Sequence, residues 1–238
     1  HSTSRRQCQM CIRDSTHSIS SGHGSEDTIT DMIRCASESG LSLFGISDHG
    51  PATSSSAKPS YFQSLKLADR DRFGIRVLYG VELNIINTAG DVDLDDEILS
   101  ALDYAIISIH PPIFKPYHDK DLSSAYIRAM DHPKVRFLGH IDDARFPVDF
   151  EYLLEIAKEK HVYPEINNGS LMPDAYRING QENCRRILSI CKKLDLPVLL
   201  SSDSHGKKNI GNMQYIFPLL EELDFPAHFC LLYTSDAA

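Results

Sequence analysis

The feature that most constrains the fold is a regular alternation between short, almost entirely apolar segments and segments with a helical spacing of apolar residues. The segments YAIISI at residues 104–109 and PVLLSS at residues 197–202 are examples of the apolar kind. A strand without polar alternation is buried on both faces, as in parallel sheets that helices cover on either side. About seven such strand–helix units favour a closed or nearly closed β/α barrel over an open sheet.

The same patterns give element bounds. Strands are predicted at residues 16–19, 41–46, 77–81, 104–109, 135–138, 162–166 and 198–200. Helices are predicted at residues 25–39, 95–102, 122–130, 150–160, 181–194 and 212–223. Ser25 is the expected N-cap of the first helix, and Gly40 its stop. Residues 51–74 are read as a polar loop with a weaker helix, and a loop of this length is usually functional.

A chain of 238 residues, 42% of them hydrophobic, can bury one core, so we predict a single domain over residues 16–229. Residues 1–15 and 230–238 lack the periodicity of the rest and look like translated sequencing-adapter read-through, which makes them non-native termini. The absence of a long apolar run predicts a cytoplasmic protein without a membrane partner. The net charge of −9 argues against nucleic acid as a partner, whereas a small anion held by metal ions remains compatible.

Histidines and carboxylates follow the predicted strands. In a β/α barrel, residues just past the carboxyl ends of the strands share one pocket, so side chains from distant segments are expected to meet there. The eight candidate metal ligands are His17, His23, His49, Glu82, His110, His140, Asp203 and His205. Imidazoles suit zinc, manganese or iron, and a carboxylate can bridge two cations. A closed structural zinc site needs only four ligands, so the surplus favours a multinuclear catalytic site.

Other interpretations apply to single residues. A lone histidine is usually a surface residue or a hydrogen-bonded core residue, which is our interpretation of His1, His118, His132, His161 and His228. Asp48 and Asp203 could each cap a following helix, because aspartate is a favoured N-cap. The recurrence of histidine beside both aspartates favours the metal site.

Seven motifs, THSISSGH, ISDHGP, GVELNI, SIHPP, FLGHID, EINN and SSDSHG, resemble those of the polymerase and histidinol phosphatase (PHP) superfamily, most closely its YcdX-like phosphatase branch. The resemblance covers residues 16–226 and implies a distorted seven-stranded β/α barrel with three metal ions. It places His17, Glu82 and Asp203 around one ion. It places Glu82, His110 and His140 around a second, and His23, His49 and His205 around a third.

The family's first motif is His-x-His, and Ser15 stands here at its first position. Because Ser15 falls in the suspected read-through, we expect the natural protein to carry a histidine there. The first ion would then have lost one ligand in this chain.

The expected activity is hydrolysis of a small phosphorylated substrate with two or three divalent ions, zinc first and manganese or iron as alternatives. Metal ions about 3.5–4 Å apart activate water and clamp phosphoryl oxygens. Asp48 is expected to assist proton movement, and Arg177 to contact phosphate. The alternatives are a non-catalytic or proofreading PHP module, and a metal-dependent amide hydrolase. Amide hydrolases on such barrels often carry a bridging, carboxylated lysine on a central strand. The sequence has no lysine at any predicted strand end, which argues against this second alternative.

Overall fold

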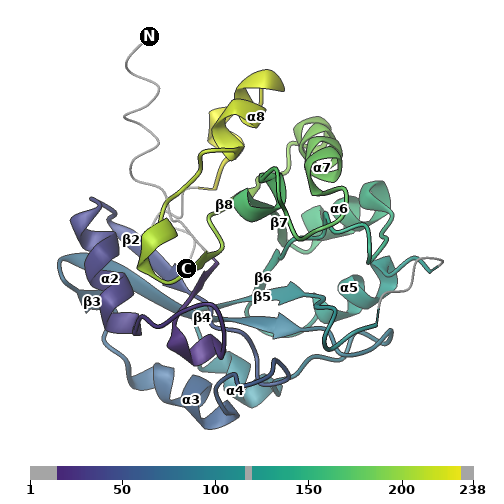
Figure 1. The fold of residues 1–238 in the computed structure, drawn as a ribbon. Coiled ribbons are helices and arrows are strands. Elements are labelled where there is room, and N and C mark those ends of the chain that lie inside the picture. The colour runs from purple at the N-terminus through teal and green to yellow at the C-terminus, as the bar shows by residue number, and fades with distance from the viewer. Residues whose placement is uncertain (1–14, 116–119, 232–238) are drawn as a thin grey trace.

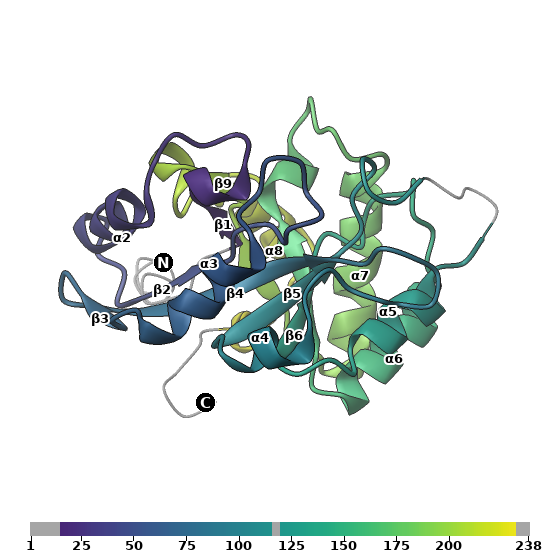
Figure 2. The same cartoon turned by 90° about the horizontal axis from the view of Figure 1, so that it is seen from below.

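The computed structural model describes residues 15–115 and 120–231. Its main sheet contains β2 (Leu43–Ile46), β4 (Ile75–Asn84), β5 (Tyr104–Ser108), β6 (Val135–Leu138), β7 (Tyr163–Asn167) and β8 (Leu199–Ser201), in that spatial order. Neighbouring strands in this series are parallel. The six strands curl into a half-barrel (Figures 1 and 2).

Two very short strands bridge the gap between β8 and β2. β1 (Thr16–His17) pairs in parallel with β9 (Ser204–His205). On its other side β1 meets the end of β2, where Ser47 N donates to Thr16 O at 3.0 Å. Since β9 follows β8 after two residues, the circuit of strands is nearly complete. The prediction of an α/β, distorted β/α barrel is therefore confirmed.

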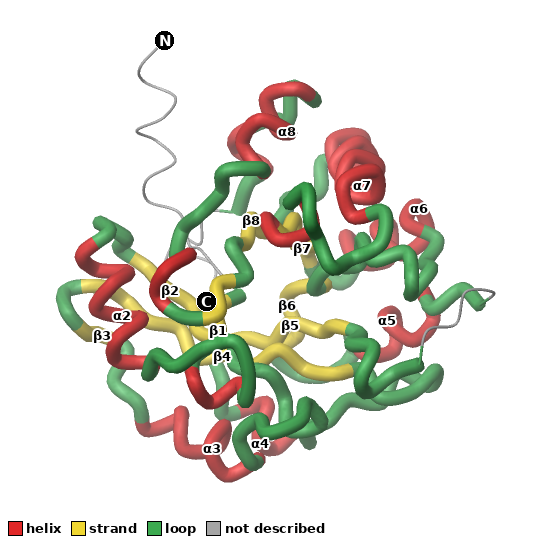
Figure 3. The backbone as a smooth tube through the Cα atoms, viewed as in Figure 1, coloured by secondary structure: helices red, strands yellow, loops and turns green. Residues whose placement is uncertain are grey.

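Helices surround the strands on the outside, as the red tubes around the yellow strands show (Figure 3). They are α2 (Ile29–Glu38), α3 (Pro59–Ser64), α4 (Asp96–Ser100), α5 (Ser123–Ala129), α6 (Phe150–Glu159), α7 (Gly180–Leu194) and α8 (Ile216–Glu222). Short 3₁₀ turns lie at Ile19–Ser21 (η2), Leu65–Leu67 (η3), Asn168–Leu171 (η4), Lys207–Asn209 (η5) and Ala227–Phe229 (η6). The large apolar core joins buried residues of the helices and strands, and a small second cluster contains Tyr104, Ile106, Phe137 and Leu199.

The first helix begins later than predicted, because Thr28 rather than Ser25 is its N-cap. Thr28 and Asp31 form a capping box, with Asp31 N donating to Thr28 Oγ1 at 3.2 Å and Thr28 N donating to Asp31 Oδ2 at 3.0 Å. A cap of this kind stabilises a helix by about 1 kcal/mol. Ser25 instead accepts a hydrogen bond from Asp27 N in the preceding turn.

The last helix is also shorter than predicted. Asn212 Oδ1 accepts from Gln214 N at 3.1 Å, and Asn168 Oδ1 accepts from Tyr215 N at 3.0 Å. These side-chain bonds compete with helical hydrogen bonding, so α8 starts only at Ile216.

The long segment before β4 contains the predicted helix, now α3, and a strand that the pattern did not predict. This strand, β3 (Asp71–Arg72), pairs antiparallel with the start of β4. Phe73 and Gly74 both have positive φ, at 51° and 78°. A two-residue turn with both φ values positive matches the twist of a hairpin, which explains the pairing.

The predicted read-through segments lie mostly outside the described residues. At the C-terminal side, Cys230 is buried and forms a parallel bridge with Val198, and Leu231 N donates to Val198 O at 2.8 Å. Whether these termini are native stays a prediction. Among the described residues, no helix combines the length and apolarity needed to cross a bilayer.

Candidate metal centre

Glu82 lies at the centre of the cluster of predicted ligands. Its Oε2 is 3.3 Å from His17 Nε2 and 3.2 Å from His49 Nδ1. Its Oε1 is 3.4 Å from His110 Nε2 and 3.1 Å from His140 Nε2. Glu82 belongs to β4, while the four histidines belong to or follow β1, β2, β5 and β6. One buried carboxylate thus faces four imidazoles from four different strand ends.

Asp203, between β8 and β9, forms the second carboxylate of the cluster. Its Oδ1 is 3.3 Å from His17 Nε2 and 3.7 Å from His205 Nδ1. Its Oδ2 accepts hydrogen bonds from Arg177 Nη2 at 2.9 Å and from Asn167 Nδ2 at 3.0 Å. His17 therefore bridges the two carboxylates.

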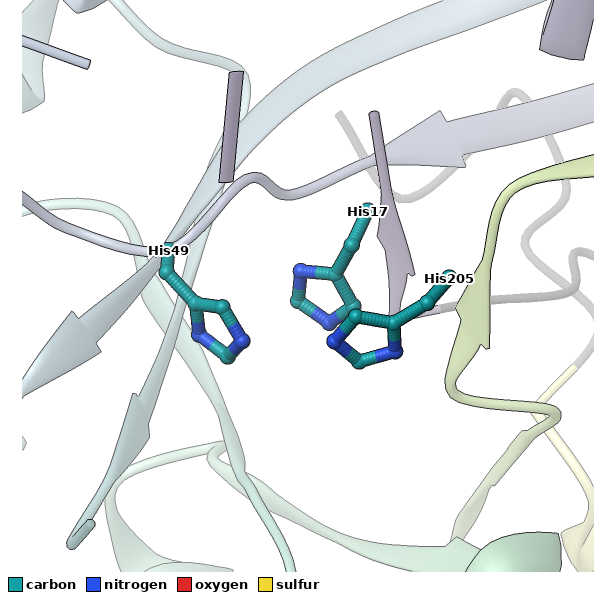
Figure 4. Close-up of side chains that lie close together, drawn as sticks. All are labelled: His17, His49 and His205. Atoms are coloured by element: carbon teal, nitrogen blue, oxygen red, sulfur yellow. The ribbon is translucent and has the colours of Figure 1, made fainter. Parts of the chain in front are cut away.

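Four imidazoles stack beside these carboxylates. The ring centroid of His17 lies 4.2 Å from that of His49 and 4.4 Å from that of His205 (Figure 4). His23, from the loop before α2, stacks on His49 at 4.9 Å and lies 5.2 Å from His205. With His23 included, all eight predicted ligands are brought together.

The spacing of the donor atoms fits divalent cations. Two ligand atoms bound tetrahedrally to one zinc ion, each about 2.0–2.1 Å from it, are separated by about 3.3 Å. The contacts of Glu82 and Asp203 with His17, His110 and His140 span 3.1–3.4 Å. Two groups of three have ligand atoms within 4.8 Å of one another, namely His17, His49 and His205, and His49, Glu82 and His110. Among the described residues, His49 Nδ1 is buried and makes no hydrogen bond of acceptable geometry, although Glu82 Oε2 lies 3.2 Å away. A buried nitrogen left without a hydrogen bond beside a carboxylate fits a metal ligand.

Hydrogen bonds behind the histidines select which ring nitrogen carries a proton. Ser21 Oγ donates to Asp48 Oδ1 at 2.7 Å, so it must accept where His17 Nδ1 approaches it at 3.2 Å. His17 therefore keeps a proton on Nδ1, and its Nε2 faces the two carboxylates. His205 Nδ1 lies 3.2 Å from the carbonyl oxygen of Asp203, which only accepts, so this ring also carries its proton on Nδ1. A donor bond of this kind orients a metal-binding imidazole and makes it a better ligand.

The charges in the cluster oppose one another. Burial lowers the pKa of His17, but hydrogen bonds and charge from Asp203 and Glu82 outweigh burial and raise it to about 10. Burial together with the charge of His17 lowers the pKa of His49 well below its usual value and that of His205 to about 4. An imidazolium at His17 beside neutral imidazoles at His49 and His205 is thus the favoured state of the metal-free protein.

This arrangement predicts that zinc binding releases protons. Because the His17 Nε2 proton lies between the carboxylates and the pKa is about 10, His17 is protonated at pH 7 and must lose that proton to bind a metal ion. Calorimetric titration with zinc in two buffers of different ionisation enthalpy should show about one proton released per protein at pH 7 and none above the pKa. A heat of binding that is independent of buffer at pH 7 would contradict this prediction.

Two of the candidate ligands have strained backbones. His140 has φ of 31° and Asp203 has φ of 50°, in the left-handed region that non-glycine residues rarely adopt. The backbone of His140 is held there by Glu165, whose Oε2 accepts from His140 N at 2.8 Å. Such conformations cost on the order of 1–3 kcal/mol and concentrate at functional sites.

Asp48, predicted to assist proton movement, is buried and accepts four hydrogen bonds. Its donors are Ser18 N and Oγ at 2.6 and 2.8 Å, Ser21 Oγ at 2.7 Å and Tyr61 OH at 2.5 Å. Burial and the charge of Asp48 raise the pKa of Tyr61, so the phenol stays protonated and donates. Asp48 therefore reaches His17 through Ser21.

Arg177, the predicted phosphate contact, lies beside Asp203. Burial lowers its pKa, but the charges of Asp203 and Asp142 outweigh burial and raise it, so the guanidinium stays charged.

Ser15 is buried, and its Oγ is 3.1 Å from His17 Nε2, so this position faces the candidate site. His118 and His1 fall outside the described residues.

The sequence patterns missed several residues behind the ligands. Asn84, whose Oδ1 is 2.7 Å from His110 Nδ1, lies two residues after Glu82 on the same face of β4, so strand periodicity could have revealed it. Ser21 and Glu165 lie within the motifs THSISSGH and EINN, but no spacing rule singles them out, and Asp93 lies outside all seven motifs. The contacts of these three residues come from the tertiary fold.

Comparison with known proteins identifies the family. The model of the PHP domain matches residues 15–169. The chain belongs to the PHP domain family. A relative from Clostridium acetobutylicum, named as a probable phosphatase, is 36% identical over 211 residues, covering 89% of this chain and 85% of the relative. Another probable phosphatase, from Acetivibrio thermocellus, is 33% identical and covers 91% of this chain and 88% of its own length.

Solved structures show the same PHP fold. The histidinol phosphate phosphatase of Lactococcus lactis, solved with zinc, L-histidinol and phosphate, has a TM-score of 0.61 at 19% identity, with 91% of this chain and 94% of that chain covered. A putative histidinol phosphatase from Listeria monocytogenes has a TM-score of 0.59 at 18% identity, with 84% and 97% covered. At such identities these two structures support the fold alone.

Proposed function

We propose that this PHP protein is a metal-dependent phosphatase that hydrolyses the phosphate ester of a small substrate. The observation that carries the proposal is the position of Glu82, a buried carboxylate within 3.4 Å of four imidazole nitrogens from four strand ends. The names of the PHP relatives and the zinc, L-histidinol and phosphate in the Lactococcus lactis structure agree with it.

The ligand roles follow the family's pattern. Glu82 would hold two ions at once, one with His17 and Asp203 and one with His110 and His140. A third would lie with His23, His49 and His205. Ions held in this way supply activated water and neutralise charge on phosphoryl oxygens. Zinc fits the imidazole-rich donor set, and manganese or iron would be accepted by the same ligands.

Two further residues complete the proposal. The Arg177 guanidinium lies beside Asp203 and can orient a phosphoryl oxygen by a charge-assisted hydrogen bond. Asp48, acting through Ser21, holds a proton on His17 Nδ1 and leaves Nε2 free to bind metal. This is how Asp48 would take part in proton placement without touching the substrate.

The test compares the chain as given with the Ser15→His variant. We expect two to three equivalents of zinc or manganese by elemental analysis, hydrolysis of p-nitrophenyl phosphate, and loss of activity with a chelator. Ser15→His should bind the first ion more tightly, since position 15 faces His17 Nε2. A Ser189→His variant on the exposed face of α7 controls for adventitious binding by an added histidine.

Two outcomes would overturn the proposal. One is the absence of stoichiometric metal in both proteins. The other is stoichiometric metal without hydrolysis of p-nitrophenyl phosphate, its bis ester or a broader panel of phosphate esters. Preference for the mono ester or the bis ester would define the class of substrate.

A further inference from the structure

Asp93 connects two ligand-bearing segments although it is not itself a candidate ligand. It lies between β4 and α4, and its Oδ1 accepts from Asn84 N at 2.9 Å. Its Oδ2 accepts from Asn84 Nδ2 at 2.6 Å and from Ala52 N at 2.9 Å. One carboxylate therefore ties the end of β4 to the turn that follows His49.

The turn after His49 is shaped around this carboxylate. A Cβ atom at Gly50 would lie 2.3 Å from Asp93 Oδ2, so any other residue here would push the Asp93 carboxylate out of place. Glycine at this place lets the backbone approach Asp93, and Gly50 N donates to Glu82 O at 2.8 Å. The close approach of Asp93 thus explains the glycine of the SDHG motif. By fixing the backbone at Gly50 and Ala52, Asp93 also helps to fix the position of His49.

The hydrogen bonds that Asp93 accepts also determine which side-chain atoms of Asn84 donate and which accept. An ionised carboxylate only accepts, so the Asn84 side chain must present its NH₂ group to Asp93 and its Oδ1 to the other side. Asn84 Oδ1 lies 2.7 Å from His110 Nδ1, which must therefore donate. The lone pair of His110 is then left on Nε2, which lies 3.4 Å from Glu82 Oε1 and 3.2 Å from His140 Nε2.

We propose that Asp93 is a positioning residue that acts through Asn84 to hold His110 in its metal-binding tautomer and through Gly50 and Ala52 to place His49. The inference rests on the proposed metal-dependent function, to which it adds the origin of the ligand geometry. Asp93 touches neither substrate nor metal in this role.

The variant Asp93→Asn changes the acceptors that orient Asn84 and, through Asn84, the proton position on His110. We call this series of hydrogen bonds from His110 to Asn84 and from Asn84 to Asp93 the relay. An amide replaces one carboxylate oxygen by NH₂, so either Asn84 N, or Asn84 Nδ2 together with Ala52 N, loses its acceptor. Where the new NH₂ meets Asn84 Nδ2, the Asn84 side chain flips and presents its own NH₂ to His110 Nδ1. His110 responds by moving its proton to Nε2, the atom that would bind metal. Zinc affinity should fall about 10–100-fold, the usual effect of losing a hydrogen bond behind a metal ligand.

Two measurements test this. Long-range ¹H–¹⁵N spectra of the histidine rings in the metal-free protein should show His110 protonated on Nδ1 in the wild type and on Nε2, wholly or in part, in Asp93→Asn. Competition with a chromogenic chelator gives the zinc affinity. Asp91→Asn, an exposed change of the same type two residues away, should leave both unchanged.

A double variant makes the test independent of general damage to the fold. Asn84→Asp together with Asp93→Asn exchanges the two groups, so that the new amide donates to the new carboxylate and the carboxylate accepts from His110 Nδ1. This pair should restore the Nδ1 tautomer and recover at least part of the zinc affinity. A merely structural role for Asp93 predicts no such recovery.

The proposal is overturned if wild-type His110 is protonated on Nε2, if Asp93→Asn keeps both tautomer and affinity, or if Asp91→Asn has the same effect. Failure of the proposed function would look different. In that case the wild type itself would bind no zinc stoichiometrically, while the ring spectra would still report whether the relay exists.

Discussion

Replacing Glu82 by glutamine is expected to abolish stoichiometric metal binding and to lower kcat/KM by on the order of 10³-fold or more, because the ions that Glu82 is proposed to hold would supply several kcal/mol of charge stabilisation. Glutamine keeps the shape of the side chain but removes the charge that faces His17, His49, His110 and His140. Burial raises the pKa of Glu82, but the four surrounding imidazoles outweigh burial and hold this pKa well below its usual value, so the native carboxylate is ionised.

Elemental analysis and steady-state kinetics of the metal-supplemented protein measure this effect. The matched control is Glu97→Gln, a change of the same type on the exposed side of α4, which should leave metal content and rate unaltered. Retention of two or more metal equivalents and of activity within tenfold in Glu82→Gln would refute the role of this carboxylate as the shared ligand.

Replacing Arg177 by alanine is expected to destabilise the metal-free protein by about 3–5 kcal/mol, the usual effect of leaving a buried charge without its partner. Asp203 would lose its 2.9 Å ion pair, and Asp142 would lose a neighbouring positive charge. The ionised forms of Asp142 and Glu165 are already disfavoured, since burial raises the pKa of both, that of Glu165 to about 8. Zinc, by supplying positive charge beside Asp203, should reduce the loss.

Urea unfolding with and without zinc measures the free energy of unfolding. Arg186→Ala on α7 is the control, because its ion pair with Glu151 is more than half exposed and is worth less than about 1 kcal/mol. Equal destabilisation by the two substitutions, or a loss at Arg177 that zinc leaves unchanged, would contradict the prediction. If Arg177 also contacts phosphate, Arg177→Lys should fold normally but show a raised KM and weaker inhibition by inorganic phosphate.

The sequence was most informative where one physical rule applied to many segments. Buried parallel strands are uniformly apolar, and their carboxyl ends meet, so His110 and His140 could be placed in one pocket from the pattern of each strand alone. The same rule found Glu82, although nothing in the pattern showed that it would face four histidines.

The parts that could not be predicted depend on pairwise contacts between distant segments. Thr28 and Ser25 are both acceptable N-caps, and only the reciprocal bond with Asp31 decides between them. Asp93 resembles any other acidic residue of a loop until the fold brings it to Gly50 and Asn84. The saturation of Asp48 by four donors is likewise invisible in the SDHG motif.

The narrowest part of the barrel wall has a consequence for how the molecule holds together. β1 and β9 are two residues long, yet they join the first strand of the barrel to its last, with His17 paired beside His205. An ion shared by His17 of β1 and Asp203, the residue directly before β9, would close a ring that contains most of the chain. In a simple entropic picture such a closure is worth on the order of 4–5 kcal/mol. Loss of the ions and separation of β1 from β9 would then be one coupled event, so the proposed metal centre would also stabilise the closed barrel.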